Sequence, residues 1–175
     1  MKIFSLFIIS AIALSSCSET IRTVFDQQKD FSQYKTYCWM DGCEFKFAGP
    51  GYIKDPDLHS KIEKAIVEEL KSKGLVKDDN NPDLIIGVTV AFQDETAIVY
   101  HRSEQNPYFA PVEGEREEIK YLKGSLVIGM ADKKDSKMVW ESLASRYMEL
   151  NPDLSEENIR KGIKRILRDY PPKRK

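Results

Sequence analysis

The chain has 175 residues, 41% of them hydrophobic and 31% charged, and its 27 basic and 28 acidic residues give a formal net charge of -1. The apolar fraction excludes wholesale disorder, and the length fits one domain. The near-zero charge argues against a nucleic-acid-binding protein, because such proteins usually carry a basic excess. These figures exclude no particular enzyme.

The N-terminus has the pattern of an export signal. The apolar run 3–14 is too short for a spanning helix, which needs about 20 apolar residues. It ends at Leu14-Ser15-Ser16-Cys17, which resembles the bacterial lipobox, whose cysteine thiol receives a diacylglycerol before the leader is cut away. We therefore expect residues 1–16 to be a lipoprotein signal peptide and Cys17 to be lipidated. Soluble export after Ala11-Ile12-Ala13 and a retained anchor are the alternatives.

The residues after Cys17 indicate where the protein is anchored. Ser18 follows the cysteine, whereas aspartate there would resemble the inner-membrane retention signal of enteric bacteria. We expect the outer membrane, on its periplasmic face or at the cell surface. The first strand-like run begins near Ile21, so residues 17–20 form a lipidated tether that spans at most ~15 Å. A single domain, residues 21–175, is expected to lie close to that membrane.

The first half of this domain predicts two strands, a loop and a helix. Residues 21–26 and 34–40 are rich in β-branched and aromatic residues, which favours strands, and residues 43–52 read as a loop. Asp55 is the expected N-cap of a helix that ends before Gly74. Its apolar residues follow at helical spacing: Leu58, Ile62, Ala65, Ile66 and Leu70.

The second half predicts further strands and a last helix. Residues 84–93 alternate between apolar and other side chains, and residues 97–100 continue that strand or start its neighbour. Residues 119–131 and 138–148 form a hairpin around a turn at 132–136. The last helix, capped by Ser155 and stopped by Pro171-Pro172, has one apolar stripe, formed by Ile159, Ile163, Ile166, Leu167 and Tyr170.

The element order predicts an α+β fold. Reduced to its main elements the order is β-α-β-β-β-α, and adjacent strands imply hairpins. We expect a two-layer sandwich: a mostly antiparallel sheet with the two amphipathic helices on one face.

Several phrases together carry a resemblance to a known family. In chain order they are Asp30-Phe31-Ser32-Gln33-Tyr34-Lys35-Thr36-Tyr37-Cys38-Trp39, Pro82-Asp83-Leu84-Ile85-Ile86, Lys123-Gly124-Ser125-Leu126-Val127-Ile128, Met138-Val139-Trp140, and the segment from Ile163 to Pro172. With these phrases behind a lipobox, the chain resembles the bacterial envelope lipoproteins grouped as domain of unknown function 4136. The resemblance implies a lipid-anchored α+β domain, no established activity and no catalytic residues. Trp39 and Trp140 lie in these phrases, and we expect core packing for both.

Two cysteines remain once Cys17 is assigned to the anchor. Cys38 and Cys43 are close in sequence across a turn, and they are not part of the family pattern. A disulfide is plausible in an oxidising envelope, where so small a ring stabilises by about 2 kcal/mol. The other interpretation, two unbonded cysteines, stays open. We predict no metal site, because the two histidines, His59 and His101, are not at metal-ligand spacing.

A long connection follows the strand that ends near Tyr100. It places aromatic and cationic side chains together, and interfaces are enriched in such residues: Tyr100, His101, Arg102, Tyr108 and Phe109. Contact with a partner or ligand is one interpretation, and a hairpin without such a role is the other.

The sequence carries no motif that specifies catalysis. It lacks the Gly-x-Ser-x-Gly elbow, the His-Glu-x-x-His metal motif, the phosphate-binding loop and the dinucleotide fingerprint. We predict no catalytic residue and no cofactor. The first hypothesis is a non-enzymatic binding, scaffold or assembly module, attached to the membrane by its lipid, with an unknown envelope protein or ligand and no nucleic acid as partner. The alternatives are a carrier or sensor of a small apolar ligand held between sheet and helices, and an enzyme of unrecognised class.

Overall fold

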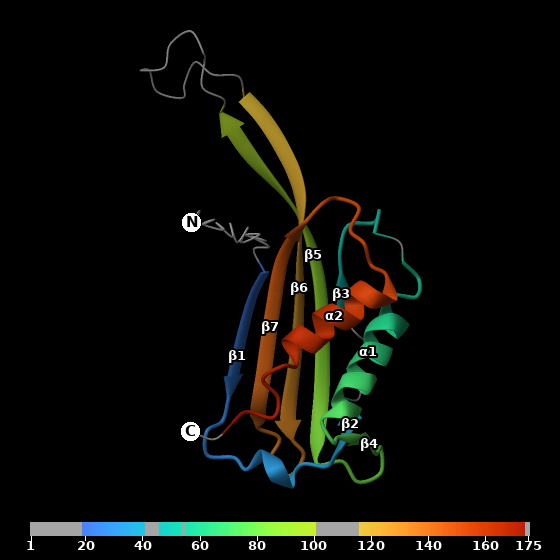
Figure 1. Cartoon of the computed structure of the whole chain (residues 1–175), viewed down its shortest axis with the longest axis vertical. Helices are drawn as coiled ribbons and strands as arrows, with labels where there is room; N and C mark the ends of the chain where they lie inside the picture. Colours follow the sequence, from blue (N-terminus) through green and yellow to red (C-terminus); the bar gives the residue numbers. More distant parts are fainter. Residues whose placement is uncertain (1–18, 41–45, 54, 101–115, 174–175) are drawn as a thin grey trace, which may run out of the picture.

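The computed structural model describes residues 19–40, 46–53, 55–100 and 116–173. These residues form an α+β fold, which confirms the predicted class (Figure 1). In chain order the elements are β1 (Glu19–Phe25), a 3₁₀ turn (Phe31–Gln33), β2 (Thr36–Trp39), β3 (Lys46–Ala48), α1 (Leu58–Ser72), β4 (Val76–Lys77), β5 (Leu84–Tyr100), β6 (Arg116–Asp132), β7 (Met138–Met148) and α2 (Glu156–Ile166).

The strands of the described residues form one mixed sheet. Its order is β1-β7-β6-β5-β2-β4, and β3 also pairs with β5. The four long strands β1, β7, β6 and β5 are antiparallel neighbours, whereas β2 and β3 run parallel to β5 and β4 runs parallel to β2. The sheet is thus antiparallel over its long strands and parallel at one edge.

Two short strands are absent from the predicted order. β3 lies within residues 43–52, which read as a loop because Gly49-Pro50-Gly51 dominates that segment. β4 has only two residues, too few to show a periodicity. All three parallel pairings involve the short strands β2, β3 and β4. The hydrophobic pattern of the sequence therefore predicted this edge of the sheet less well than the long strands.

Alternation along the long strands separates two faces of the sheet. One face is buried and meets the helices, and in β5 its residues are Leu84, Ile86, Val88, Val90 and Phe92. The buried stripes of α1 and α2 pack against it, from the same side of the sheet (Figure 1). The other face, called the open face below, carries the exposed side chains of Val24, Leu143 and Tyr147.

The helix ends follow the predicted chemistry with two corrections. The first is that α2 ends at Ile166, so Leu167 and Tyr170 lie after the helix and Pro171-Pro172 is not what stops it. The Ser155 hydroxyl accepts a hydrogen bond from the Asn158 N–H at 3.4 Å, and Gly74 follows α1 with a φ of 85°, both as predicted. Asp55 is not the N-cap of α1, because the helix begins at Leu58 with Asp57 before it. The Asp55 carboxylate accepts from the Asp57 N–H at 3.0 Å instead, and so closes a turn ahead of the helix.

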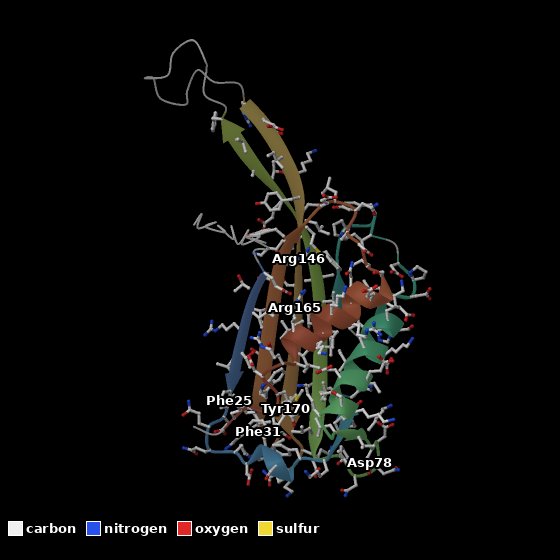
Figure 2. The ribbon with its side chains drawn as sticks, viewed as in Figure 1. Phe25, Phe31, Asp78, Arg146, Arg165 and Tyr170 are labelled. Atoms are coloured by element: carbon white, nitrogen blue, oxygen red, sulfur yellow. The ribbon has the colours of Figure 1, made fainter. Side chains whose placement is uncertain are left out.

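An aromatic cluster closes one end of the core. Phe31 makes edge-to-face contacts with Phe25, Tyr34 and Tyr170 at ring-centroid distances of 6.3, 5.8 and 5.9 Å. Trp140 meets Tyr170 in the same way at 5.6 Å. Figure 2 shows Phe25, Phe31 and Tyr170 together at one end of the molecule. Four of the five residues come from the phrases that carry the family resemblance, so those phrases mark packing.

Candidate binding surfaces

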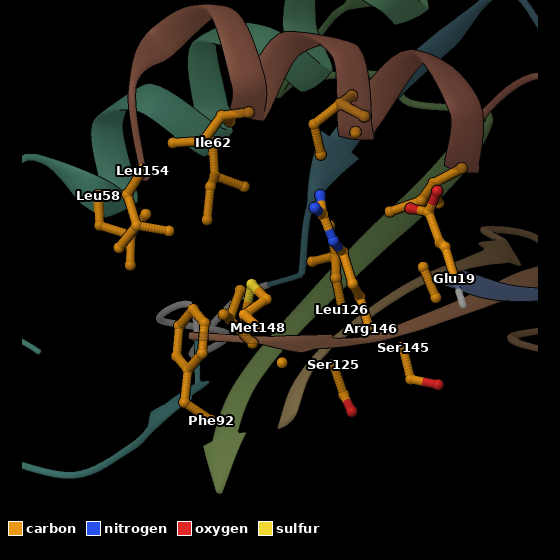
Figure 3. Close-up of a pocket in the computed structure, with 17 residues that line it drawn as sticks. Glu19, Leu58, Ile62, Phe92, Ser125, Leu126, Ser145, Arg146, Met148 and Leu154 are labelled. Carbon is orange, nitrogen blue, oxygen red and sulfur yellow. The ribbon is translucent and has the colours of Figure 1, made fainter. Parts of the chain in front are cut away.

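The first candidate is an apolar pocket between the sheet and the two helices (Figure 3). Its volume is about 150 Å³. The sheet forms its floor, α1 and α2 form its roof, and its apolar lining includes Leu58, Ile62, Phe92, Leu126, Met148 and Ile159. At this place the inward-facing residues of β5, β6 and β7 and the facing residues of α1 and α2 do not fill all of the space between the sheet and the helices.

Charged groups gather on one side of this pocket. Glu19, the first residue of β1, forms an ion pair with Arg165 of α2. Arg165 Nε lies 2.9 Å from Glu19 Oε2, and Arg165 Nη2 donates to Glu19 Oε1 at 3.2 Å. Arg146 of β7 lies directly across the strand pair from Glu19 and lines the same pocket. Figure 3 shows its guanidinium in the space between the sheet and α2. Within the described part of the chain, no carboxylate forms an ion pair with Arg146.

Two glycines shape the pocket. A Cβ at Gly162, in the middle of α2, would meet no atom within 4 Å, so the helix leaves open space there. Glycine costs a helix about 1 kcal/mol relative to alanine, and no close approach at this position requires it. At Gly124, on the floor, a Cβ would lie 2.4 Å from the terminal methyl of Met148 and 3.2 Å from the Phe92 ring.

The second candidate is a projecting two-stranded ribbon. β6 pairs with β7 only from Leu122 onward, and β3 pairs with β5 only at residues 89–91. Among the described residues, 95–100 of β5 and 116–121 of β6 therefore pair only with each other, and we call them the β5–β6 ribbon. Figure 1 shows this ribbon extending beyond the rest of the domain.

The ribbon exposes large apolar side chains on both of its faces. Ile98 and Tyr100 point to one face, where they are 45% and 51% exposed. Ile119 points to the other face, pairs with Ala97 and is 43% exposed. That second face continues into the open face of the sheet through Tyr121 and Tyr147, whose rings meet edge to face at 5.2 Å. A two-stranded ribbon is marginally stable alone in water, so these exposed apolar side chains make the ribbon a candidate binding surface.

A buried polar cluster lies at the far end of β6. The Asp132 carboxylate accepts from Lys29 Nζ at 2.8 Å, from the Tyr34 hydroxyl at 2.9 Å and from the Lys134 N–H at 2.8 Å. The hydrogen bond from Lys29, joined by those from Lys134 and Tyr34, lowers the pKa of Asp132 to about 2 against the cost of burial. Burial, with the bond to Asp132, raises the pKa of Tyr34 to about 12. Every bond of the cluster is satisfied by the fold, so we assign it a structural role.

The residues predicted from the sequence fall into two groups. Tyr100 lies at the end of the ribbon, and Cys38 lies in β2, where pairing with Ile85 puts it on the open face. Cys17, Cys43 and the remaining residues of the long connection, His101, Arg102, Tyr108 and Phe109, lie outside the described residues. The predicted lipidation and disulfide therefore stay predictions.

The sequence analysis identified several apolar residues that line the pocket, but it missed Arg146 and Gly162. Arg146 lies in β7 two residues after buried Ala144, so the alternation of the strand places it on the face that meets the helices. A charged residue at an inward-facing position was the signal that could have found it. Gly162 had a signal as well, since it interrupts a helix with good apolar spacing.

Two kinds of feature are absent from the described residues. No helix there is both long and apolar enough to span a membrane. No cluster of three or more histidine, cysteine, aspartate or glutamate side chains is arranged there to hold a metal ion.

Comparisons with known proteins give a family and a fold. The family model described as Domain of unknown function (DUF4136) matches residues 21–172. No curated protein matches the chain. Among solved structures, a PDZ domain protein from Parabacteroides distasonis shares 21% identity over 89% of this chain, with a TM-score of 0.54. The match covers only 36% of that protein, so this chain spans about a third of its length.

Two other solved structures are more distant. The PelC dodecamer of Paraburkholderia phytofirmans is 14% identical, with 85% of this chain and 94% of that chain covered and a TM-score of 0.46. A homolog of a neuraminyllactose-binding hemagglutinin from Helicobacter pylori is 12% identical, with 81% and 88% covered and a TM-score of 0.47.

Proposed function

This chain belongs to the family described as Domain of unknown function (DUF4136), and we propose that it is a lipoprotein of the outer membrane that binds an envelope protein through the β5–β6 ribbon. The observation that carries the proposal is the ribbon itself, with exposed Ile98, Tyr100 and Ile119 beyond the edge of the core. The role is one of binding, scaffolding or assembly. It is non-enzymatic, in keeping with a sequence that lacks the common catalytic motifs.

The membrane anchor is proposed on the lipobox that ends in Cys17. Cleavage before that residue would remove the 16-residue leader and leave one lipidated domain. β1 begins at Glu19, two residues before the expected start near Ile21. A lipidated Cys17 would then be two residues from the sheet, a reach of roughly 7 Å. The domain would sit directly on its membrane, since two or three acyl chains give a stable anchor.

The same geometry supports a membrane-proximal position for the proposed partner. The register aligns Glu19 with Arg146, Gly124 and Phe92 across four strands, and the ribbon leaves the sheet next to that row. From there to Tyr100 the ribbon extends by roughly 25 Å at ~3.3 Å per residue. Anchor and ribbon thus share one end of the domain, so we propose that the partner is a membrane-proximal protein.

Two further features belong to the proposal. We take the domain to be the two-layer sandwich expected from the sequence, with α1 and α2 as one layer and the sheet as the other. The membrane face on which the protein is anchored, periplasmic or cell-surface, decides which partners the domain can reach. An outer-membrane protein with loops or strand edges exposed near the bilayer could be the partner on either face.

Lipidation predicts a simple labelling result. In cells grown with labelled palmitate, the wild-type chain should incorporate label, and Cys17→Ala should abolish it because no thiol remains at the lipobox. Cys38→Ala is the matched control and should keep full labelling. Label that persists on Cys17→Ala would exclude the proposed anchor.

Charge placed on the ribbon should release the partner. We expect Ile98→Asp combined with Ile119→Asp to lower recovery of the native complex about tenfold or more, because each carboxylate would have to be desolvated in the interface. Val76→Asp is the control, since Val76 is an exposed aliphatic residue of an edge strand at the other end of the domain. Blue-native electrophoresis of membranes measures the result. Equal recovery of the complex by the ribbon variant and the control would contradict the proposal.

A second candidate function has its own observation. The pocket of about 150 Å³ between sheet and helices favours a carrier or sensor of a small apolar ligand. Native mass spectrometry of the chain from cells tests it, with a co-purified small molecule as the expected result. This function and the ribbon are compatible, because the pocket and the ribbon use different residues.

A further inference from the structure

We propose that the pocket between the sheet and α2 binds an aliphatic monocarboxylate, with the alkyl chain inside and the carboxylate on Arg146. The inference rests on the second candidate function and names its ligand class. It is independent of the ribbon and of the anchor.

The size and lining of the pocket suit an alkyl chain. A volume of about 150 Å³ matches that of an enclosed apolar cavity that takes up benzene, although this pocket is open to solvent, so a longer chain could extend out of it. Leu58 and Ile62 lie above it, and Phe92, Leu126 and Met148 lie below (Figure 3). Ile159 of α2 also lines it. An alkyl chain makes dispersion contacts with all of these surfaces and needs no hydrogen bond from them.

The charge beside the pocket suits a monoanion. The Arg165 guanidinium already neutralises Glu19, through contacts of 2.9 and 3.2 Å. Arg146 is left with its full positive charge, since no described carboxylate forms an ion pair with it. One carboxylate would pair with one guanidinium, in the bidentate geometry that arginine favours. A neutral alcohol of the same length would leave this charge unpaired.

Gly162 provides the space for the ligand. Gly162 lines the pocket, and no atom lies within 4 Å of the position where its Cβ would stand. A larger residue at position 162 would extend into the pocket, whereas a larger residue on the outer side of α2, such as at Lys164, would not. This difference gives a matched pair of substitutions on one helix.

The source of the ligand can be separated from the protein's own anchor. The acyl chains of a lipidated Cys17 carry no free carboxylate, so they would leave Arg146 unpaired. We commit to a free fatty acid, and the full chain carrying Cys17→Ala removes the attached lipid from the experiment.

The test compares octanoate with 1-octanol by titration calorimetry on the full chain carrying Cys17→Ala. We expect octanoate to bind about tenfold more tightly, which corresponds to one good charge-assisted contact. Arg146→Gln should reduce this preference to within about twofold. Gly162→Leu should abolish binding of both compounds, and Lys164→Leu should leave both unchanged.

Two other results of the titrations would contradict the proposal in different ways. Equal binding of octanoate and 1-octanol, unaffected by Arg146→Gln, would overturn the inference and leave the apolar-ligand function standing. No binding of either compound would overturn both. Arg146 is exposed, so Arg146→Gln should fold even if Gly162→Leu does not, and its effect on the preference decides the inference alone.

Discussion

Asp132→Ala should lower the free energy of unfolding by about 3 kcal/mol, the size expected when one member of a buried charged cluster is removed. The Asp132 side chain is only 6% exposed and accepts bonds from Lys29, Tyr34 and Lys134. The substitution leaves the Tyr34 hydroxyl and the Lys29 ammonium without this acceptor. Urea unfolding at pH 7 followed by circular dichroism measures the loss.

The same residue predicts a pH dependence with a definite sign. The pKa of Asp132 is about 2 in the folded chain, mainly through the bond from Lys29, against an ordinary value near 3.9. Because the pKa of Asp132 is lower in the folded than in the unfolded chain, its ionised carboxylate stabilises the fold at every pH above its unfolded pKa. This stabilisation is lost as the pH falls from about 4 through about 2. The urea midpoint of the wild type should therefore fall more steeply over that range than that of Asp132→Asn.

Asp135 provides the control for this cluster. It also bonds Lys29, at 3.0 Å, but its side chain is 37% exposed. Asp135→Ala should therefore change stability only slightly, because water replaces the lost contact. Equal losses for Asp132→Ala and Asp135→Ala would show that burial is not what makes the cluster stabilising.

Trp140→Ala should cost about 3–5 kcal/mol, the range for truncating a fully buried large aromatic residue. Trp140 is among the largest fully buried side chains, and its ring packs edge to face on Tyr170. The cavity left behind would loosen the contact between β7 and the segment after α2. Chemical denaturation measures the cost, with an unchanged m-value expected if unfolding stays two-state.

Trp140→Phe separates packing from hydrogen bonding at this position. Within the described residues, the Trp140 indole N–H is buried without a hydrogen-bond partner. Phenylalanine therefore sacrifices ring volume but no bond, and we expect a cost well below that of alanine. A cost for Trp140→Phe as large as that for Trp140→Ala would indicate that the indole N–H has a role that the described contacts do not include.

The sequence predicted the regular part of the fold well. The strand at 138–148 matches β7 at both ends, and Ser155 caps α2 as expected, because alternation and capping are local signals. β3 and β4 were missed because they are held by parallel pairing with distant strands, which local sequence does not encode. The N-cap of α1 was misplaced by two residues, since Asp55 and Asp57 carry the same local signal.

The candidate sites were harder to predict for the same reason. Asp132 read as one residue of a surface turn, and only the tertiary fold brings Lys29 and Tyr34 to it. Tyr100 was singled out, but Ile98 and Ile119 were not. Their exposure results from the long register of β5 with β6, which runs beyond the other strands. Apolar alternation predicts a buried face and cannot show whether another described element covers it.

The most direct test of the proposed function is photo-crosslinking in intact cells. A photoreactive amino acid placed at Ile98 or at Ile119 should give crosslinks to one discrete membrane-proximal protein, identified by mass spectrometry. The same amino acid at Val76, on the other end of the domain, should give none to that protein. Crosslinks to that protein from Val76 but not from Ile98 or Ile119, or no protein crosslinks from the ribbon at all, would contradict the account.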